Sequence, residues 1–324
     1  MPLALLFVLT TTGCLQQRLQ QARSKNQTAA RHTTKKTARK RGKKDGPQIK
    51  KTPARAGREP KIIVRIQGKT RHIPLEQYVA GVVASEMPSR WHSQALQAQA
   101  ITARTYALRQ MQQRAGKPYH VQANVLDQVY KGAVSSQSPS AQATQATRGL
   151  VVTWQGQLAH TYFHATCGDH TTDAQTVWGR AEPYLQGVSC RFCSKARKQY
   201  RWSVQVDWNT LNKAVRTLAP GRIRQLHMGK KLPCGRLQSV QLVGRQKSQI
   251  PTTKLRQLLG YNRLPSTWIT NIQNSRTHVV FTGQGHGHGV GMCQWGAAGM
   301  ATAGYTATQI LEHYYPGTRL QRWY

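Results

Sequence analysis

The stretch Leu75–Arg114, LEQYVAGVVASEMPSRWHSQALQAQAITARTYALRQMQQR, contains two helical patterns separated by a proline. The first pattern, Leu75–Ser85, has apolar residues at helical spacing, and Pro88 stops it. The second pattern follows Ser93, a suitable N-cap, and continues over Gln94–Arg114 with many Ala and Gln residues. The stretch therefore predicts a helix, a sharp break and a second, longer helix.

Shorter elements are predicted on both sides of this helical pair. Strand patterns cover Lys61–Gln67, a hairpin of Gly149–Trp154 and Gln157–Thr166, Trp202–Asp207, Leu237–Gly244 and His278–Thr282. Helical patterns cover Asn209–Leu218, Met292–Ala303 and Thr308–Tyr315. The sequence has no internal repeat, and the two kinds of element do not alternate regularly. This order predicts an α+β domain with mixed short strands and several helices, and disfavours a doubly wound parallel sheet.

The chain is strongly basic, with a formal net charge of +37 from 47 Lys and Arg residues against 10 Asp and Glu residues over 324 positions. Such a charge attracts polyanions in general. Nucleic acid, anionic lipid and an acidic polymer of the cell envelope all qualify, so the charge does not choose among them.

The N-terminus has the pattern of a targeting segment. Met1–Thr12, MPLALLFVLTTT, is apolar, too short to span a bilayer and followed by Gly13-Cys14. Small residues before a cysteine are typical of a bacterial lipoprotein signal, although no basic residue precedes the apolar run. We therefore expect residues 1–14 to direct export, with Cys14 as the lipidated residue of the mature protein.

Residues 15–61 have the composition of a disordered basic linker. They are rich in Gln, Lys, Arg and Thr and contain almost no large apolar side chain. Such a segment cannot bury enough apolar surface to offset its loss of conformational entropy. It also lacks the aromatic residues that stack on nucleic-acid bases. The folded domain is therefore expected over residues 62–324.

Carboxylates are scarce, so each candidate general acid can be considered in turn. Most of the ten occupy linker, turn or helix-surface positions. Glu86 differs because it follows the apolar helix and precedes Met87-Pro88, where the helix breaks. Loss of solvent at such a position would raise the pKa of its carboxyl group, as a general acid requires. The alternative is an ordinary surface glutamate at a helix end.

The segment Gly283–Ala301, GQGHGHGVGMCQWGAAGMA, is rich in glycine and histidine. It is not a phosphate-binding loop, because Gly291 is followed by Met292 and not by Lys-Ser/Thr. A metal site is disfavoured, because no nearby acid completes a set with His286 and His288. The glycines instead indicate close approach of the backbone to a ligand or to a neighbouring element.

The six cysteines leave an odd number if Cys14 carries lipid, which disfavours a regular set of disulfides. Cys190-Arg191-Phe192-Cys193 forms a CxxC motif, and Cys167 lies about twenty residues before it. This pattern is moderately specific for structural zinc. In an exported chain disulfides compete, and free thiols are the third alternative. Cys293, at the start of a helix, is a further candidate ligand or a small core residue.

Three segments together resemble the SpoIID/LytB family of stage II sporulation protein D and amidase-enhancer proteins. They are YVAGVVASEMPSRWHSQALQAQAITARTYAL (Tyr78–Leu108), HTYFHATCGDHTTDAQTVWG (His160–Gly179) and GHGHGVGMCQWGAAGMATAGYTATQILEHYYPGT (Gly285–Thr318). The resemblance covers roughly Ile62 to Tyr324 and is most specific in the third segment. It implies a single SpoIID-like domain.

The resemblance implies a lytic transglycosylase that cleaves glycan strands of peptidoglycan, particularly strands without peptides, with Glu86 as the catalytic glutamate. A single carboxyl group suffices for this reaction, whereas ordinary glycosidases use two. Glu86 would protonate the glycosidic oxygen and then deprotonate the 6-hydroxyl of muramic acid, which gives a 1,6-anhydro end. The second role associated with the family is that of a non-catalytic, wall-binding enhancer of an N-acetylmuramoyl-L-alanine amidase.

Candidate substrate-binding residues come from the three matched segments. They are Gln99, Arg104, Tyr106, His164, His286, His288 and Gln294. The reaction requires no cofactor. Some family members carry a His/Cys zinc cluster before the segment that corresponds to Gln128-Val129-Tyr130. This chain has Leu126-Asp127 there and no cysteine nearby, so a structural zinc would have to use Cys167, Cys190, Cys193 or Cys293.

The expected partners follow from these interpretations. They are peptidoglycan glycan strands, an amidase and anionic polymers of the envelope, with no specific nucleic acid. Contact with a membrane is expected only through a lipid anchor at Cys14. The expected location is the cell envelope.

Overall fold

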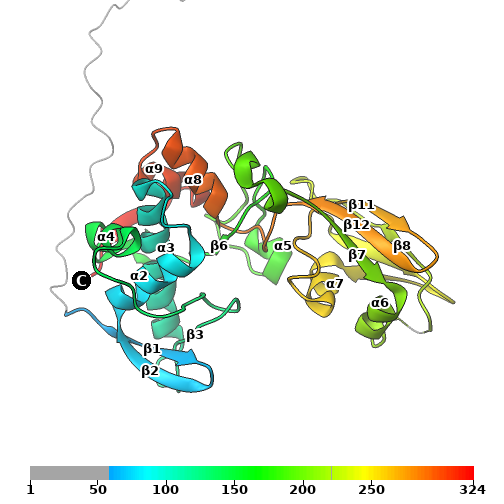
Figure 1. The fold of residues 1–324 in the computed structure, drawn as a ribbon, viewed down its shortest axis with the longest axis horizontal. Coiled ribbons are helices and arrows are strands. Elements are labelled where there is room, and N and C mark those ends of the chain that lie inside the picture. The colour runs from blue at the N-terminus through cyan, green and yellow to red at the C-terminus, as the bar shows by residue number, and fades with distance from the viewer. Residues whose placement is uncertain (1–57, 220) are drawn as a thin grey trace, which may run out of the picture. The chain divides into compact units, whose positions relative to one another are not determined.

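The computed structural model describes residues 58–219 and 221–324. The signal-like segment, Cys14 and the linker up to residue 57 lie outside the described residues. Helices and short strands are mixed along the described chain, which confirms the predicted α+β class (Figure 1). None of the helices within the described ranges is long and apolar enough to cross a membrane.

The first hydrophobic core packs helices against small sheets. β1 (Lys61–Ile66) pairs antiparallel with β2 (Lys69–Pro74) and parallel with β3 (Val121–Gln122). The helices α2 (Leu75–Glu86), α3 (Ser93–Gln113) and α4 (Pro139–Ala146) follow one another in the chain and pack together (Figure 1). The N-cap of α3 is His92, whose ring Nδ1 accepts the backbone N–H of Gln94, and not Ser93 as predicted.

The C-terminal segments complete this first core. The central strand β4 (Leu150–Trp154) pairs with β5 (Gln157–Leu158) on one side and with β14 (Arg319–Arg322) on the other. The helices α8 (Gln294–Thr302) and α9 (Ala307–Tyr314) pack on α3 (Figure 1). A two-stranded parallel sheet of β6 (Phe163–His164) and β13 (Met292–Cys293) joins the second and third of the segments quoted above.

A second hydrophobic core, which we call the β-rich module, is built from residues 201–284. Its sheets have the orders β11-β12-β7 and β10-β9-β8. The strands are β7 (Arg201–Asp207), β8 (Gln225–Met228), β9 (Ser239–Val243), β10 (Lys247–Pro251), β11 (Ile269–Asn274) and β12 (His278–Gln284), with helices α6 (Trp208–Val215) and α7 (Thr252–Leu259). Two short helical segments, α5 (Ala174–Trp178) and the 3-10 helix η1 (Ser194–Gln199), precede this module.

The predicted boundary between linker and domain at residue 61 is too late. Glu59 accepts a hydrogen bond from the backbone N–H of Glu76 at 2.9 Å and pairs with Arg148 at 2.6 Å. The carboxylate of Glu59 therefore joins the N-terminus of α2 to the end of α4, so residues just before β1 belong to the folded part.

A buried ion pair joins α2 to α3. The guanidinium of Arg104 is fully buried and donates two hydrogen bonds to Glu76, at 2.9 and 2.6 Å. It also donates to the carbonyl oxygens of Thr144 and Leu150 at 3.1 Å each. All these partners lie within the fold, so the structure corrects the expectation that Arg104 binds substrate: the side chain holds α3 to α2, α4 and β4.

Substitution of Glu76 tests this role. Removing one partner of a buried ion pair leaves an uncompensated charge, and the usual cost is about 3–5 kcal/mol. We expect Glu76→Gln to lower the free energy of unfolding by that amount in urea denaturation followed by circular dichroism. The matched control is Glu312→Gln on the exposed surface of α9, for which we expect a change within about 0.5 kcal/mol. Equal effects of the two substitutions would contradict the assignment.

Candidate functional site

The carboxylate of Glu86 lies where three distant segments meet. Glu86 is the last residue of α2 and is half-buried. Its Oε1 accepts a hydrogen bond from the backbone N–H of Val129 at 3.0 Å, and its Oε2 accepts one from Nε2 of Gln294 at 3.3 Å. The predicted acid and the predicted residue Gln294 are therefore in direct contact, although 208 positions separate them.

The surroundings of Glu86 favour its protonated form. Burial raises the pKa of the Glu86 carboxyl above its ordinary value, and this effect is the largest. The hydrogen bonds from Val129 and Gln294, together with the charge of Lys131, act in the opposite direction. The net rise in pKa is what a general acid needs at neutral pH.

The loop 128–131 is fixed over the end of α2. Tyr78, on α2, donates a hydrogen bond to the side chain of Gln128 at 3.2 Å, and the backbone N–H of Lys131 donates to Oγ of Ser85 at 3.1 Å. Gly81 allows this close packing, because a Cβ there would lie 2.4 Å from the ring of Tyr130. These contacts hold the backbone N–H of Val129 in place against Glu86.

Asp127 lies close in sequence to this loop, but its carboxylate stabilises the fold through contacts with other residues of the protein. It pairs with Arg114 at 3.0 Å and accepts hydrogen bonds from the hydroxyl of Tyr106 at 2.8 Å and the backbone N–H of Gln122 at 2.8 Å. Across residues 58–219 and 221–324, no second carboxylate is hydrogen-bonded to Glu86 or to the groups that contact it directly. Among the described carboxylates, Glu86 is therefore the one held by Val129 and Gln294.

Two tryptophans that were not predicted from the sequence pack against each other, and one of them follows Gln294. Trp91 follows the break after α2, and Trp295 follows Gln294 directly in the chain. Their rings meet edge to face with centroids 4.9 Å apart, and both are partly exposed. The signal in the sequence was their position, since Trp91 comes five residues after Glu86 and Trp295 directly follows Gln294. Partly exposed aromatic faces are common where a ligand binds.

Among the histidines expected to face the substrate, His288 is engaged with the protein through both ring nitrogens. Nε2 of His288 contacts the carbonyl oxygen of Phe163 at 2.9 Å, and its Nδ1 accepts the backbone N–H of Val290 at 3.1 Å. Burial, followed by the charge of Arg256, lowers the pKa of His288 to about 3. Both ring nitrogens are occupied, so the structure corrects the expectation that His288 binds substrate.

His164 and His286 differ in exposure. His164 is buried, contacts the carbonyl oxygen of Val290 through Nδ1 at 3.1 Å and leaves Nε2 without a protein partner. His286 is half-buried, and its backbone forms a bridge with Thr166. Burial lowers the pKa of both imidazoles. His286 therefore keeps the surface access that a substrate contact needs, whereas His164 does not.

Two further predicted substrate residues are enclosed by the fold. The hydroxyl of Tyr106 donates to Asp127, and its side chain is largely buried, so its expected substrate contact is corrected to a structural one. Gln99 is fully buried on α3, and neither its amide nitrogen nor its amide oxygen has a protein partner. A fully buried amide does not reach a surface glycan, which corrects that expectation as well.

The glycine-rich segment packs against the protein and not around a phosphate. Gly285, Gly287, Gly289 and Gly291 all have positive φ. A Cβ on Gly285 would lie 2.7 Å from the carbonyl oxygen of Cys167, and a Cβ on Gly291 would lie 2.2 Å from that of Tyr162. Of the two alternatives left by the sequence, close approach to a neighbouring element is the one observed.

Four of the cysteines form one buried cluster. The Sγ atoms of Cys167, Cys190, Cys193 and Cys293 all lie within 4.8 Å of one another. All five described cysteines are free, and Cys234 lies outside the cluster. The structure thus brings together every cysteine that the sequence named as a candidate metal ligand.

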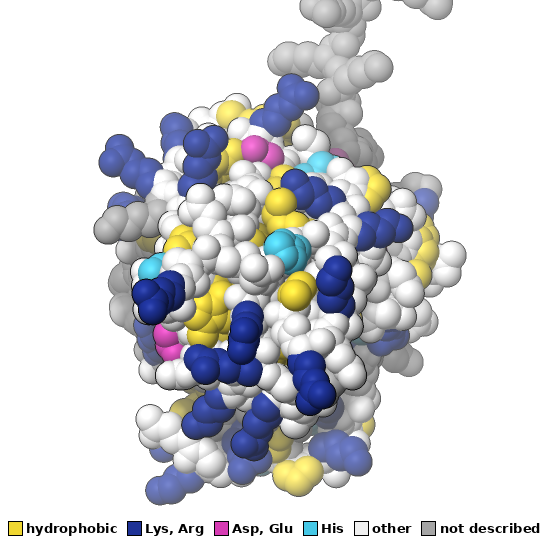
Figure 2. Space-filling model, turned by 90° about the vertical axis from the view of Figure 1, so that its right-hand side faces the viewer, with side chains coloured by type: hydrophobic (Ala, Val, Ile, Leu, Met, Phe, Trp, Pro, Cys, Tyr) yellow, Lys and Arg dark blue, Asp and Glu magenta, His cyan; other side chains and the backbone are white. Residues whose placement is uncertain are grey.

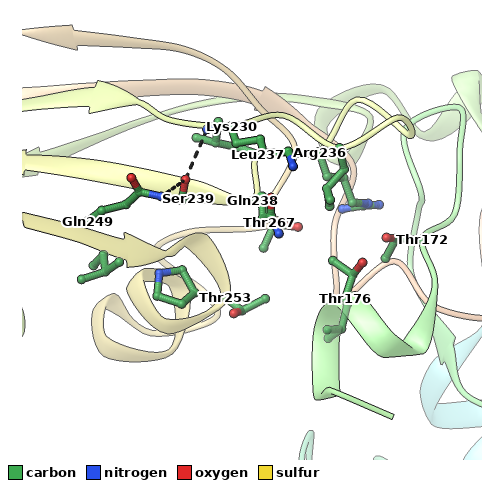
Figure 3. A pocket seen from close by; sticks show the side chains of 14 residues that line it. Thr172, Thr176, Lys230, Arg236, Leu237, Gln238, Ser239, Gln249, Thr253 and Thr267 are labelled. Carbon is green, nitrogen blue, oxygen red and sulfur yellow. Dashed lines mark hydrogen bonds between the residues drawn. The ribbon is translucent and has the colours of Figure 1, made fainter. Parts of the chain in front are cut away.

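One pocket of the described structure does not include Glu86 in its lining. It has a volume of about 390 Å³ and is lined by residues of the β-rich module, among them Lys230, Arg236 and Gln249, and by Thr172 and Thr176 from the segment before it (Figure 3). The side chain of Gln249 and the backbone of Lys230 both donate to the hydroxyl of Ser239. None of the predicted catalytic or substrate-binding residues lines this pocket.

Comparison with known proteins shows the family of the chain. Residues 66–154 match the family described as stage II sporulation protein, and residues 174–291 match a domain of unknown function. The chain is 31% identical to stage II sporulation protein D of Bacillus subtilis in an alignment 276 residues long that covers 77% of this chain and 75% of that protein. The chain belongs to the stage II sporulation protein D family.

Two further relatives match over similar parts of the chain. An uncharacterized protein of Brachyspira hyodysenteriae is 35% identical over 246 residues, which is 75% of this chain and 65% of that protein. The amidase enhancer of Bacillus subtilis is 26% identical over 287 residues, 74% of this chain but only 40% of the enhancer. The family match at residues 66–154 includes α2, the loop 128–131 and hence Glu86.

The pKa of Glu86 is directly measurable, because the sequence has only ten side-chain carboxyl groups. In a carbon-detected NMR titration we expect Glu86 to titrate above the ordinary glutamate value of about 4.3. Gln294→Leu removes a hydrogen bond that stabilises the carboxylate, so it should raise the pKa of Glu86 further. Gln257→Leu, on the exposed surface of α7, is the control and should leave it unchanged. A pKa of Glu86 at or below 4.3 in the unsubstituted protein would contradict the proposed environment.

Proposed function

We propose that this protein is a lytic transglycosylase of the bacterial cell envelope, acting on peptidoglycan glycan strands and particularly on strands without peptides. The observation that carries the proposal is the carboxyl group of Glu86, with its raised pKa, two N–H donors and no hydrogen-bonded carboxylate within the described residues. The names of the related proteins support a role in the cell wall, since one is a stage II sporulation protein and another an amidase enhancer.

The reaction needs one group that gives a proton and then takes one back. Protonated Glu86 donates its proton to the glycosidic oxygen as the bond from that oxygen to C1 of the muramic acid breaks. The resulting carboxylate accepts the proton of the 6-hydroxyl while O6 forms the new bond to C1. The products are a free hydroxyl end and a 1,6-anhydro end, and no water is consumed. Gln294 and Val129 stabilise the carboxylate between the two steps.

The engagement of Asp127 supports this reaction over ordinary glycoside hydrolysis. Hydrolases place a second carboxylate within about 5–10 Å of the acid, to attack the sugar or to activate water. Asp127, the nearest acid in the chain after Glu86, is neutralised by Arg114 and occupied by Tyr106 and Gln122. Intramolecular attack by a substrate hydroxyl is the route that one carboxyl group can support.

The basic surface of the protein is complementary in charge to anionic polymers of the cell envelope. Figure 2 shows Lys and Arg side chains spread over one face and few Asp or Glu side chains among them. Exposed basic residues of the β-rich module include Arg201, Arg216, Arg222, Arg224, Lys230, Lys231, Arg245 and Lys247. Asp207 is the only acidic residue of residues 201–284. We propose that this charge retains the protein on anionic envelope polymers, with export directed by the N-terminal segment and anchoring by a lipid on Cys14.

The second candidate function is that of a non-catalytic enhancer of an amidase. The observation that favours it is the 26% identity to an amidase enhancer over 287 residues. On this alternative Glu86 would serve binding or stability, and the protein would raise the rate of an amidase without cleaving glycan itself.

Substitution of Glu86 separates the two functions. Purified protein is incubated with peptide-free glycan strands, and 1,6-anhydro-muramic ends are counted by mass spectrometry. We expect Glu86→Gln to reduce their formation by about 10²- to 10⁴-fold, the usual contribution of a general acid. In the unsubstituted protein, activity should fall as the pH rises through the pKa of Glu86, because the acid is then already ionised.

The control for this experiment is Glu312→Gln, which removes an exposed carboxylate far along the chain and should leave activity unchanged. Anhydro ends formed equally by Glu86→Gln would contradict the catalytic assignment. Stimulation of an amidase with no anhydro ends from any of the three proteins would support the enhancer function instead.

A further inference from the structure

We propose that Cys167, Cys190, Cys193 and Cys293 bind one structural zinc ion that fixes the start of α8, and with it Gln294, against Glu86. The inference rests on the cysteine cluster and its surroundings and does not depend on the proposed activity. It adds a metal site that the family match and the related proteins do not name.

The geometry of the cluster fits a single tetrahedral ion. Four thiolates at the usual zinc–sulfur distance of about 2.3 Å have sulfur–sulfur separations of about 3.8 Å. The four Sγ atoms all lie within 4.8 Å of one another, and those of Cys167 and Cys193 are 3.6 Å apart. An iron–sulfur cluster distributes its thiolates over several iron atoms and so holds them farther apart. Four sulfur ligands around one point are typical of structural zinc.

The groups around the cluster are arranged to stabilise thiolates. Sγ of Cys293 accepts two backbone N–H groups, from Cys167 and from Gly296, at 3.2 Å each. The buried hydroxyl of Tyr314 lies 3.1 Å from Sγ of Cys190. Donors aimed at sulfur are the outer contacts that a metal-bound thiolate requires.

Arg236 provides an independent indication of negative charge at this site. Its side chain is fully buried, and Nη2 donates to the carbonyl oxygen of Cys167 at 2.8 Å. Nε and Nη1 have no protein partner, and none of the ion pairs found in the described part of the chain involves Arg236. A buried guanidinium without a counter-charge is very costly. A zinc ion with four thiolates carries a net charge of −2, which supplies the missing counter-charge.

The same charge argument disfavours two disulfides. Disulfides among the four cysteines would be neutral and would leave Arg236 without compensation. They would also have no need of the donors from Cys167, Gly296 and Tyr314. Four neutral thiols fail for the same reason, so the metal-bound form is the one that gives Arg236 a counter-charge.

The cysteine cluster links the chain segments that lie around Gln294, the residue that donates to Glu86. Cys167 follows β6, Cys190 and Cys193 flank the turn before η1, and Cys293 is the N-cap of α8. Gly296 permits the approach of the turn, because a Cβ there would lie 2.6 Å from Sγ of Cys190. Since Gln294 is the residue after Cys293, fixing Cys293 fixes the donor to Oε2 of Glu86.

The metal content of the full chain tests the proposal. We expect about one zinc per chain by inductively coupled plasma mass spectrometry of protein purified under reducing conditions and supplied with zinc. Titration with a mercurial reagent should release that zinc as four thiols react. With cobalt in place of zinc, the visible spectrum should show the intense bands of a four-sulfur tetrahedral site. No bound metal, one iron in place of zinc, or a cobalt spectrum of an octahedral site would overturn the proposal.

Two matched pairs of variants assign the site. Cys193→Ser should lose the zinc, whereas Cys234→Ser, a cysteine outside the cluster, should keep it. Arg236→Leu should weaken zinc affinity by about 10- to 100-fold, the usual effect of a lost outer contact, whereas the exposed Arg222→Leu should not. Because Cys193→Ser could unfold the protein, the metal content and cobalt spectrum of the unsubstituted chain decide the proposal. Zinc kept equally by Cys193→Ser and Cys234→Ser would contradict the assigned ligands.

Discussion

The hydrogen bond from Gln294 to Glu86 is the interaction on which the rest of the site depends. It joins the end of α2 to the start of α8 across 208 positions of the chain. The two residues meet only because α8 packs on α3, and α3 in turn is held to α2 by the pair of Arg104 and Glu76. The carboxyl group is thereby partly removed from water while both its oxygens retain one donor each. Partial burial raises the pKa of the Glu86 carboxyl group, while the two hydrogen bonds still stabilise its carboxylate form.

The polar residues of the matched segments divide into two groups with different tasks. Arg104, Tyr106 and His288 form hydrogen bonds with other residues of the protein and so stabilise the fold around the site. Glu86, His286, Trp91 and Trp295 retain access to solvent. Membership in a characteristic segment therefore does not separate a substrate contact from a structural one, because both tasks require defined side-chain chemistry.

Local patterns predicted the elements near Glu86 closely. The helices Leu75–Ser85 and Gln94–Arg114 differ from α2 and α3 by one residue at their shifted ends, since helical spacing and Pro88 are local signals. Glu86 was found because acids are scarce and because the helix breaks there. In contrast, α8 begins at Gln294 and not at the predicted Met292, because Met292–Cys293 pairs with Phe163–His164. Contacts between distant segments leave no local signal, which also explains why β14 and the burial of Gln99 were not predicted.

In the proposed reaction one carboxyl group cleaves the glycan with no activated water. The most direct measurement is digestion of peptide-free glycan strands in water enriched in oxygen-18, followed by mass spectrometry of the new ends. The account predicts 1,6-anhydro ends that contain no oxygen-18, because O6 of the substrate forms the new bond. Reducing ends that carry one oxygen-18 atom would show hydrolysis and would contradict it.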